Sequence, residues 1–304
     1  MSAIGDRERT LALRTFDRVQ PPNWTLEWSL PLWLGSALGH DAALLSCVTR
    51  SNVLGLVAVR LEDDIRDREI PPADAAAAGD VARVLMDAAI DIYRPLLAPR
   101  SRFWPELDRV LADWHAPRGT RPGNLGARRS LAGRGAPLKV GARALWLLSD
   151  RRAPWLLIDR CLDHALVALA RYDDLCDWEA DLEAGRWNAF VASCGGMPQM
   201  RARRSTNRSR VLVAMMVGGA ASRGFDAVAA EAREAARLAR ELGSEPLARH
   251  LIGLADRASA QGHSTEAHFD CVANRATAWL FGPAPMDRGR TAAIHHSGRA
   301  SPGP

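Results

Sequence analysis

Two short acidic clusters are the part of this sequence whose residue types and spacing could do chemistry. The first, LEDDIRDRE, contains Asp63, Asp64 and Asp67. The second, RYDDLCDWEAD, contains Asp173, Asp174, Asp177 and Asp181. Both have the form DDxxD. Residues four apart share one face of an α-helix, so a helix would present the outer carboxylates of each cluster side by side.

Carboxylates at this spacing indicate a site for divalent cations. Like charges stacked on an isolated helix cost about 0.2–0.5 kcal/mol per pair, so a chain that repeats the pattern needs a compensating cation. Carboxylate oxygens suit Mg²⁺, which commonly bridges a few carboxylates, its own waters and substrate phosphate oxygens. Two clusters that face one cavity could hold several Mg²⁺ ions around one diphosphate and neutralise it as a leaving group. For either cluster alone a solvated helix face is the better interpretation, but two clusters on apolar helices favour the metal site.

Composition bounds the class of protein. A chain of 304 residues with 47% hydrophobic content is long enough for one large domain. The net charge of +5 comes almost entirely from Arg, with Lys139 as the single lysine, so biased residue usage explains the charge and we expect no nucleic-acid partner. The five cysteines form no CxxC pair, and we expect them to be reduced residues of the core. No signal peptide or stretch long enough to span a bilayer is apparent, so we expect no stable membrane insertion and a cytoplasmic location.

Helical periodicity dominates the chain. Apolar residues recur at helical spacing, and no run of alternating Val, Ile and Thr indicates a sheet, which predicts an all-α fold. We expect one domain over 21–282, preceded by a flexible segment 1–20 and followed by a disordered tail 283–304. Helices are predicted over 42–68, 73–97, 103–114, 138–149 and 155–184, the last capped by Gly185, with three or four more before Phe281. Residues 116–137, with at most a short helix, and 194–210 are predicted to be loops.

The chain resembles the class I trans-isoprenoid synthase superfamily. The resemblance rests on DDIRD, on DDLCDWEADLEAGRWN, on their separation and on the helical pattern from about Trp24 to Phe281. This superfamily includes polyprenyl diphosphate synthases, squalene and phytoene synthases, and class I terpene cyclases. The resemblance implies a helical bundle with the two motifs on facing helices around a central apolar cavity. It also implies a prenyl diphosphate as substrate and, because members often dimerise, a homodimer.

The resemblance assigns a cofactor and its ligands. It implies that Asp63, Asp67, Asp173 and Asp177 contact Mg²⁺, roughly three ions in all, with Asp64 and Asp174 as close support. Terpene cyclases place ligands at positions one, five and nine of the second motif. Asp173, Asp177 and Asp181 have this spacing, which adds Asp181 to the metal-binding set.

The motifs also indicate which branch of the superfamily fits. REIPP follows DDIRD in place of the arginines of chain-elongating members, and no Gly-Lys-Arg precedes it, so the elongation machinery looks absent. The second motif departs from the cyclase pattern in residue type, and the Arg-Tyr pair near the carboxyl end of many cyclases is missing. A terpene synthase is our leading hypothesis. A prenyltransferase and a non-catalytic protein that binds prenyl diphosphates or a partner stay open.

Positively charged side chains are expected to contact the diphosphate. The faces of aromatic rings could stabilise a carbocation by about 2 kcal/mol each. The candidates for substrate contact are Arg128, Arg129, Arg134, Lys139, Arg186, Asn188 and Arg275. Trp146 and Trp279 are candidate cavity walls, with helix packing as the alternative. The Arg-rich segment 201–210 is either a lid over the diphosphate or, more simply, a solvated loop.

Overall fold

Most of the described residues of this chain lie in helices. The computed structural model describes residues 5–21, 24–115, 128–149, 154–195 and 204–281, and within them there is no β-strand. The predicted all-α class is therefore confirmed. The elements are α1 (Asp6–Arg18), α2 (Thr25–Ala37), α3 (Ala42–Arg66), α4 (Pro72–Asp91), α5 (Phe103–His115), α6 (Arg128–Arg134), the 3-10 turn η1 (Ala136–Leu138), α7 (Lys139–Leu148), α8 (Trp155–Cys176), α9 (Trp178–Ala184), α10 (Ala189–Ser193), α11 (Arg204–Met216), α12 (Ala220–Glu241) and α13 (Glu245–Phe281).

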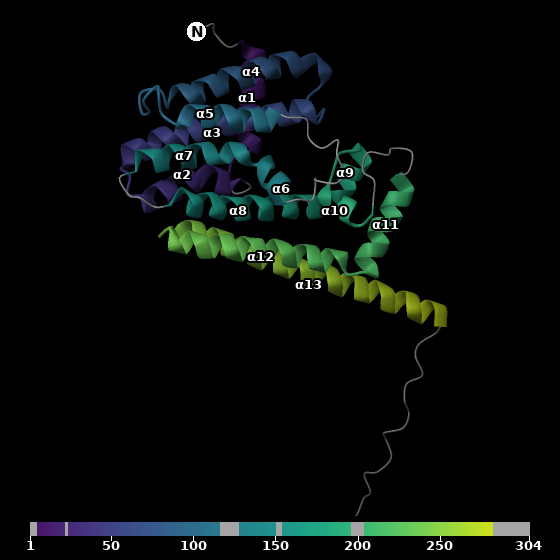
Figure 1. The fold of residues 1–304 in the computed structure, drawn as a ribbon. Helices are drawn as coiled ribbons and strands as arrows, with labels where there is room; N and C mark the ends of the chain where they lie inside the picture. The colour runs from purple at the N-terminus through teal and green to yellow at the C-terminus, as the bar shows by residue number, and fades with distance from the viewer. Residues whose placement is uncertain (1–4, 22–23, 116–127, 150–153, 196–203, 282–304) are drawn as a thin grey trace, which may run out of the picture.

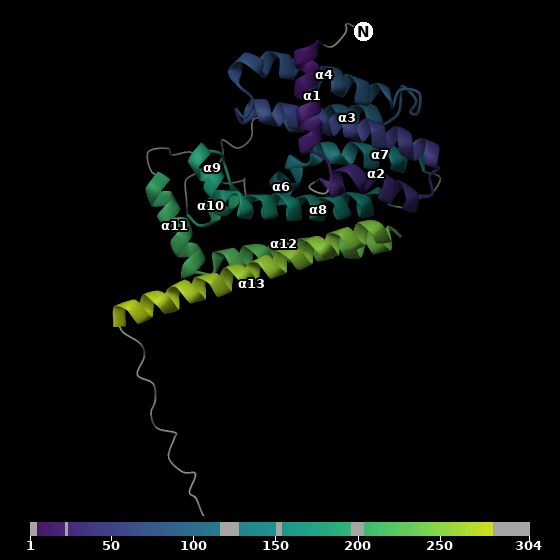
Figure 2. The same ribbon diagram turned by 180° about the vertical axis from the view of Figure 1, so that it is seen from behind.

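The long helices are stacked in layers. Helices α1 and α4 cover one side of α3, while α2 and α7 lie between α3 and α8 (Figure 1). On the other side of α8, α12 packs against both α8 and α13, as the reverse view also shows (Figure 2). The main hydrophobic core joins buried side chains of these layers, among them Leu34, Val48, Leu145, Ile158 and Leu251. The two helices that carry the acidic motifs are thus held apart by a shared core.

Helix α3 has clear start and stop signals. The side chain of Asp41 accepts a hydrogen bond from the backbone N–H of Leu44 at 2.8 Å and caps the first turn. The helix ends at Arg66, two residues before the predicted boundary, and Arg68 adopts a left-handed backbone with φ of 61°. Pro72 then opens α4, where a missing N–H costs no hydrogen bond. These signals place Asp63 and Asp67 at the carboxyl end of α3.

The predicted helix over 155–184 is two helices rather than one. Helix α8 ends at Cys176, α9 begins at Trp178, and Asp177 has a non-helical backbone between them with φ of −103° and ψ of 8°. Gly185, at φ of 71°, caps α9 as predicted. Because of this break, Asp177 does not share one helix face with Asp173 and Asp181, as it would in a continuous helix.

Other boundaries differ from the predictions. Segment 1–20, expected to be flexible, contains α1, whose Phe16 packs edge-to-face against Trp28 with ring centroids 5.5 Å apart. The loop expected over 194–210 becomes helical at Arg204, while 196–203 and the expected tail 283–304 lie outside the described residues. Of the cysteines, Cys161 is buried, but Cys176 and Cys271 are exposed, so the expectation of core cysteines holds only in part.

One helix corrects the expectation about membrane-spanning length. Helix α3 is long and apolar enough to cross a bilayer, a test that core helices of soluble proteins also pass. Helices α11 and α12 together are long and apolar enough to cross a bilayer only if they are counted as one span across a bend of 72°. In the structure α3 packs against α2, α4 and α7.

Candidate functional site

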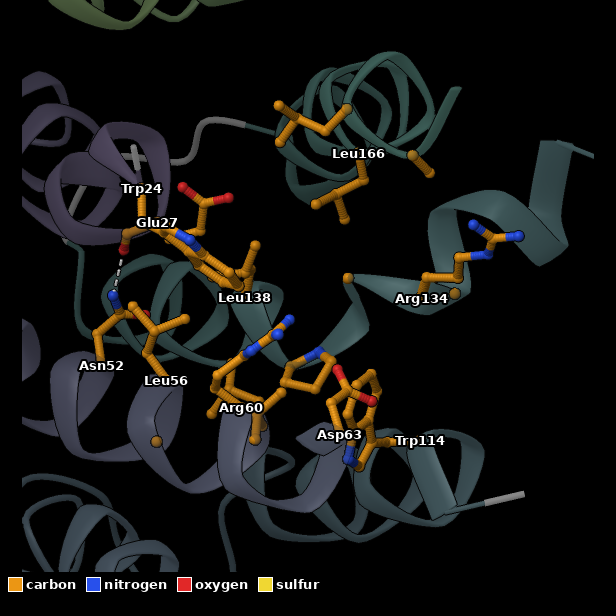
Figure 3. Close-up of a pocket in the computed structure, with 18 of the residues that line it drawn as sticks. Trp24, Glu27, Asn52, Leu56, Arg60, Asp63, Trp114, Arg134, Leu138 and Leu166 are labelled. Carbon is orange, nitrogen blue, oxygen red and sulfur yellow. Dashed lines mark hydrogen bonds between the residues drawn. The ribbon is translucent and has the colours of Figure 1, made fainter. Parts of the chain in front are cut away.

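A cavity of about 800 Å³ lies between α3 and α8. Its walls are largely apolar, and its lining also includes carboxylates of both acidic motifs. Figure 3 shows the α3 side chains that line it, which follow one another at helical spacing along a single face. Representative apolar lining residues are Leu56, Val59, Ile90, Leu107, Leu138, Leu166 and Leu169.

The first motif divides between the cavity and the protein interior. Asp63 and Asp67 both line the cavity, in agreement with their predicted common helix face. Asp64 does not line it: its side chain is 1% exposed and forms ion pairs with Arg18 Nη1 and Arg60 Nε, each at 2.8 Å. Burial raises the pKa of Asp64, although the two arginines oppose this effect. Asp64 therefore fastens α1 to α3.

The second motif is divided in a similar way. Asp173, Asp174 and Asp181 line the cavity, and Asp177, at the helix break, lies outside it. Part of Asp173 is open to solvent, yet the surrounding cavity walls raise the pKa of Asp173 to about 6, and the carboxylates of Asp177, Asp174 and Asp181 act in the same direction. A proton or a cation bound at Asp173 would reduce both the cost of its burial and this repulsion.

Buried hydrogen bonds fix two of these carboxylates. Asp174 accepts from Arg134 Nη1 at 2.9 Å and from the backbone N–H of Ala189 at 3.0 Å. Asn188, fully buried, donates to Asp181 Oδ2 at 2.9 Å and to the backbone oxygen of Asp174 at 2.8 Å. Asn188 thus holds the turn between α9 and α10 in place and does not line the cavity.

Arg186 joins the two motifs at the mouth of the cavity, which is the end where the lining residues Asp67 and Asp173 are exposed to solvent. Its Nε donates to Asp181 Oδ1 at 2.8 Å, and its Nη1 lies 3.5 Å from Glu69 Oε1, just after the first motif. The hydrogen bond to Asp181 raises the pKa of Arg186, and the nearby charges of Asp67 and Glu69 add to this effect. Carboxylates from two distant stretches of chain therefore share one cation, which places both motifs at the same mouth.

The other predicted cations have different surroundings. Arg134 lines the cavity, and its guanidinium carbon lies 4.8 Å from the ring centroid of Trp187. Arg128 pairs with Glu231, and Lys139 pairs with Asp159 and Asp163, so both are held elsewhere. Arg275 is exposed on α13. The side chain of Arg129 lies outside the described part of the structure.

The aromatic walls are not those expected from the sequence. Trp146 stacks with Arg143 at 4.4 Å and packs against Trp155, outside this cavity, and the side chain of Trp279 lies outside the described residues. The tryptophans that line the cavity are Trp24, Trp114 and Trp187. Sequence reasoning missed them because their positions on the cavity face depend on how α2, α5 and the turn after α9 pack.

The Arg-rich segment is partly described. Its residues from Arg204 onward belong to α11, where Arg208 pairs with Glu179 on α9 and Arg210 donates to the backbone oxygen of Gly195 at 3.2 Å. Arg201 and Arg203 lie outside the described residues. The described contacts tie α11 to its neighbours and place neither Arg208 nor Arg210 in the cavity.

The carboxylates at the cavity mouth are of the residue type that Mg²⁺ prefers. Among the described residues no group of three or more His, Cys, Asp or Glu side chains is close enough to hold a metal by itself. Asp67 and Asp173 make no ion pair with any described residue, and both line the mouth. An all-carboxylate set that leaves positions for waters and phosphate oxygens is typical of Mg²⁺. The negative carboxyl ends of α3 and α8 add to the attraction for cations.

Two further charged residues line the cavity and were not predicted. Arg60 lies one turn before Asp63 and pairs with Asp64 and with Glu69 at 3.1 Å. Glu27, on α2, lines the end of the cavity remote from the motifs (Figure 3). Burial raises the pKa of Glu27 to about 7. No sequence signal marks Glu27, because a glutamate in the first turn of a helix is ordinary.

No protein-family model matches this chain, and no curated protein matches it either.

Proposed function

We propose that this chain is a class I terpene synthase. It ionises an allylic prenyl diphosphate with the help of Mg²⁺ and then guides cyclisation or quenching of the resulting carbocation. One observation carries the proposal: two DDxxD motifs from distant parts of the sequence contribute carboxylates to the mouth of the same largely apolar cavity. Acidic clusters that only solvate the protein surface would not be expected to line one cavity together.

The residues at the mouth have separate roles in this proposal. Asp63 and Asp67 on one wall and Asp173 and Asp181 on the other would hold Mg²⁺, which supplies positive charge to the departing diphosphate. Arg186, already placed between the two walls, offers N–H donors to phosphate oxygens. Charge that develops on the leaving group is then met by groups fixed before the reaction begins.

The apolar walls would hold the prenyl chain and exclude water. The cavity volume of about 800 Å³ lies within the range of about 300–1,000 Å³ that is usual for ligand sites. The rings of Trp24, Trp114 and Trp187 could each stabilise a carbocation by about 2 kcal/mol when water is excluded. In this proposal the bundle is of the class I isoprenoid synthase type, with this cavity as its active site.

A direct assay tests the proposal. Purified protein is incubated with geranyl, farnesyl or geranylgeranyl diphosphate, and diphosphate release is measured with Mg²⁺ and with a chelator. We expect release that stops with the chelator and falls at least about a hundredfold in Asp173→Asn. The matched control is Asp80→Asn, an exposed aspartate on α4. No release from any of the three substrates would refute the proposal, and Mg²⁺-dependent binding without product would identify a non-catalytic binding protein.

A second observation favours prenyl transfer as the alternative function. A cavity of about 920 Å³ adjoins the first and shares Leu107, Gly133 and Val140 with it. Lys139 and Arg143 contribute to its lining. An acceptor bound there could reach the cation through the shared wall. Product that forms only with an added acceptor, and is longer than or conjugated to the prenyl chain, would establish this alternative.

A further inference from the structure

Glu27 lies at the far end of the cavity from the acidic motifs. Along α3 the lining residues run from Asn52 through Leu56 to Asp63. At 1.5 Å of rise per residue the stretch from Asn52 to Asp63 covers about 16 Å. The side chain of Asn52 donates a hydrogen bond to the backbone oxygen of Glu27, which puts Glu27 at the Asn52 end (Figure 3). A prenyl chain whose diphosphate sits at the mouth would therefore extend toward Glu27.

The carboxyl group of Glu27 faces the cavity without a cation beside it. In Figure 3 it points into the space bordered by Leu138 and Leu166. No ion pair among the described residues involves Glu27, and burial raises its pKa to about 7. The charged or titratable groups on the neighbouring lining are Arg60 from α3, which is paired with Asp64 and Glu69, and Tyr93, which follows α4. Both a protonated and an ionised form are thus accessible at neutral pH.

Helix stability alone gives a poor account of this residue. A glutamate in the first turn of α2 is favoured by the helix dipole, but by about 0.3–1 kcal/mol and equally well from an exposed position. Here the side chain is instead directed into a largely apolar cavity, where an ionised carboxylate is costly. The hydrogen bond from its own backbone N–H lowers the pKa of Glu27 but does not offset the effect of burial. A costly buried carboxyl without a paired cation is a usual sign of a functional site.

We propose that Glu27 is the base that ends the reaction, and this inference rests on the terpene synthase function proposed above. Its carboxylate oxygen takes a proton from the carbon next to the cationic centre of the bound chain. The electron pair of the broken C–H bond forms the new C=C bond, so the cation becomes a neutral olefin. The proton leaves Glu27 for water when the product departs.

Product analysis of Glu27→Gln tests this role. Gln keeps the size and polarity of the side chain but cannot take the proton at this step. We expect diphosphate release within about threefold of the unsubstituted enzyme, because Glu27 is remote from the mouth. The share of olefin among the products should fall at least about tenfold, with alcohols from water capture in its place. The exposed Glu183→Gln on α9 serves as the control and should leave both quantities unchanged.

A pH profile and a shortened variant separate a base from a structural residue. In the unsubstituted enzyme the olefin share should rise as the pH passes through about 7, because the carboxylate form becomes populated. Glu27→Gln should show no such rise. Glu27→Asp keeps the carboxyl group and should restore part of the olefin share, and circular dichroism of each variant verifies the helical fold.

The outcomes that overturn the inference differ from those that overturn the function. Diphosphate release with an unchanged product set in Glu27→Gln refutes the role of Glu27 and leaves the terpene synthase proposal standing. Absence of diphosphate release by the unsubstituted protein refutes both.

Discussion

Replacing Glu27 by Gln should make the folded protein more stable at neutral and basic pH. The pKa of Glu27 rises from 4.5 to about 7 on folding, with burial as the largest cause. At about 1.4 kcal/mol for each pH unit, this difference corresponds to about 3 kcal/mol of stability lost when the buried carboxyl ionises. Gln carries no such charge, so the variant should avoid this loss.

The sign of the pH dependence follows from proton binding. Below about pH 4.5 the carboxyl is protonated in both the folded and the unfolded protein, and the variant should match the original. Between this pH and about 7 the folded protein holds the proton that the unfolded chain has released, so the stability of the original falls. Above about pH 7 the folded protein carries the buried charge, and the full difference between the two proteins is present.

Urea unfolding near pH 5 and near pH 8 measures the effect, with Glu183→Gln as the exposed control. We expect Glu27→Gln to gain about 3 kcal/mol in free energy of unfolding near pH 8 and much less near pH 5. A variant that is less stable than the original near pH 8 would show that the attraction between the carboxylate and the amino end of α2 exceeds its desolvation cost. In that case our account of the Glu27 environment is wrong.

Other substitutions test other parts of the structure. Asp63→Asn should lower Mg²⁺-dependent diphosphate release at least about a hundredfold, while Asp80→Asn should leave it unchanged in the same assay. Gly55→Leu should fill the cavity, because a Cβ at Gly55 would meet only the Cβ of Ala89, at 4.0 Å. Turnover of geranylgeranyl diphosphate should then fall more than that of geranyl diphosphate, and equal losses would contradict the proposed position of the chain. Arg18→Gln should cost about 1–2 kcal/mol in urea unfolding, because the buried Asp64 loses one of its two cations.

The sequence alone determined the fold class and the common face of the first motif. Apolar residues at helical spacing can bury a surface only if the chain is helical, so the all-α class needed no tertiary information. The spacing of Asp63 and Asp67 fixed their shared direction, because four residues complete about one helical turn. Gly185 marked the end of a helix, because glycine readily adopts the left-handed backbone of a cap.

Tertiary structure decided which of the remaining candidates meet. Arg134 and Arg186 reach the cavity mouth while Arg128 and Lys139 are held by other acids, a difference that depends on helix packing and on no local signal. Helix α1 escaped prediction because its sequence, DRERTLALRTFDR, is mostly polar, so contacts with α3 and α4 must stabilise it. Glu27 could be recognised as a cavity residue only from the structure, in which the first turn of α2 borders the cavity. The surroundings of its side chain are set by distant parts of the chain, which the local sequence does not reveal.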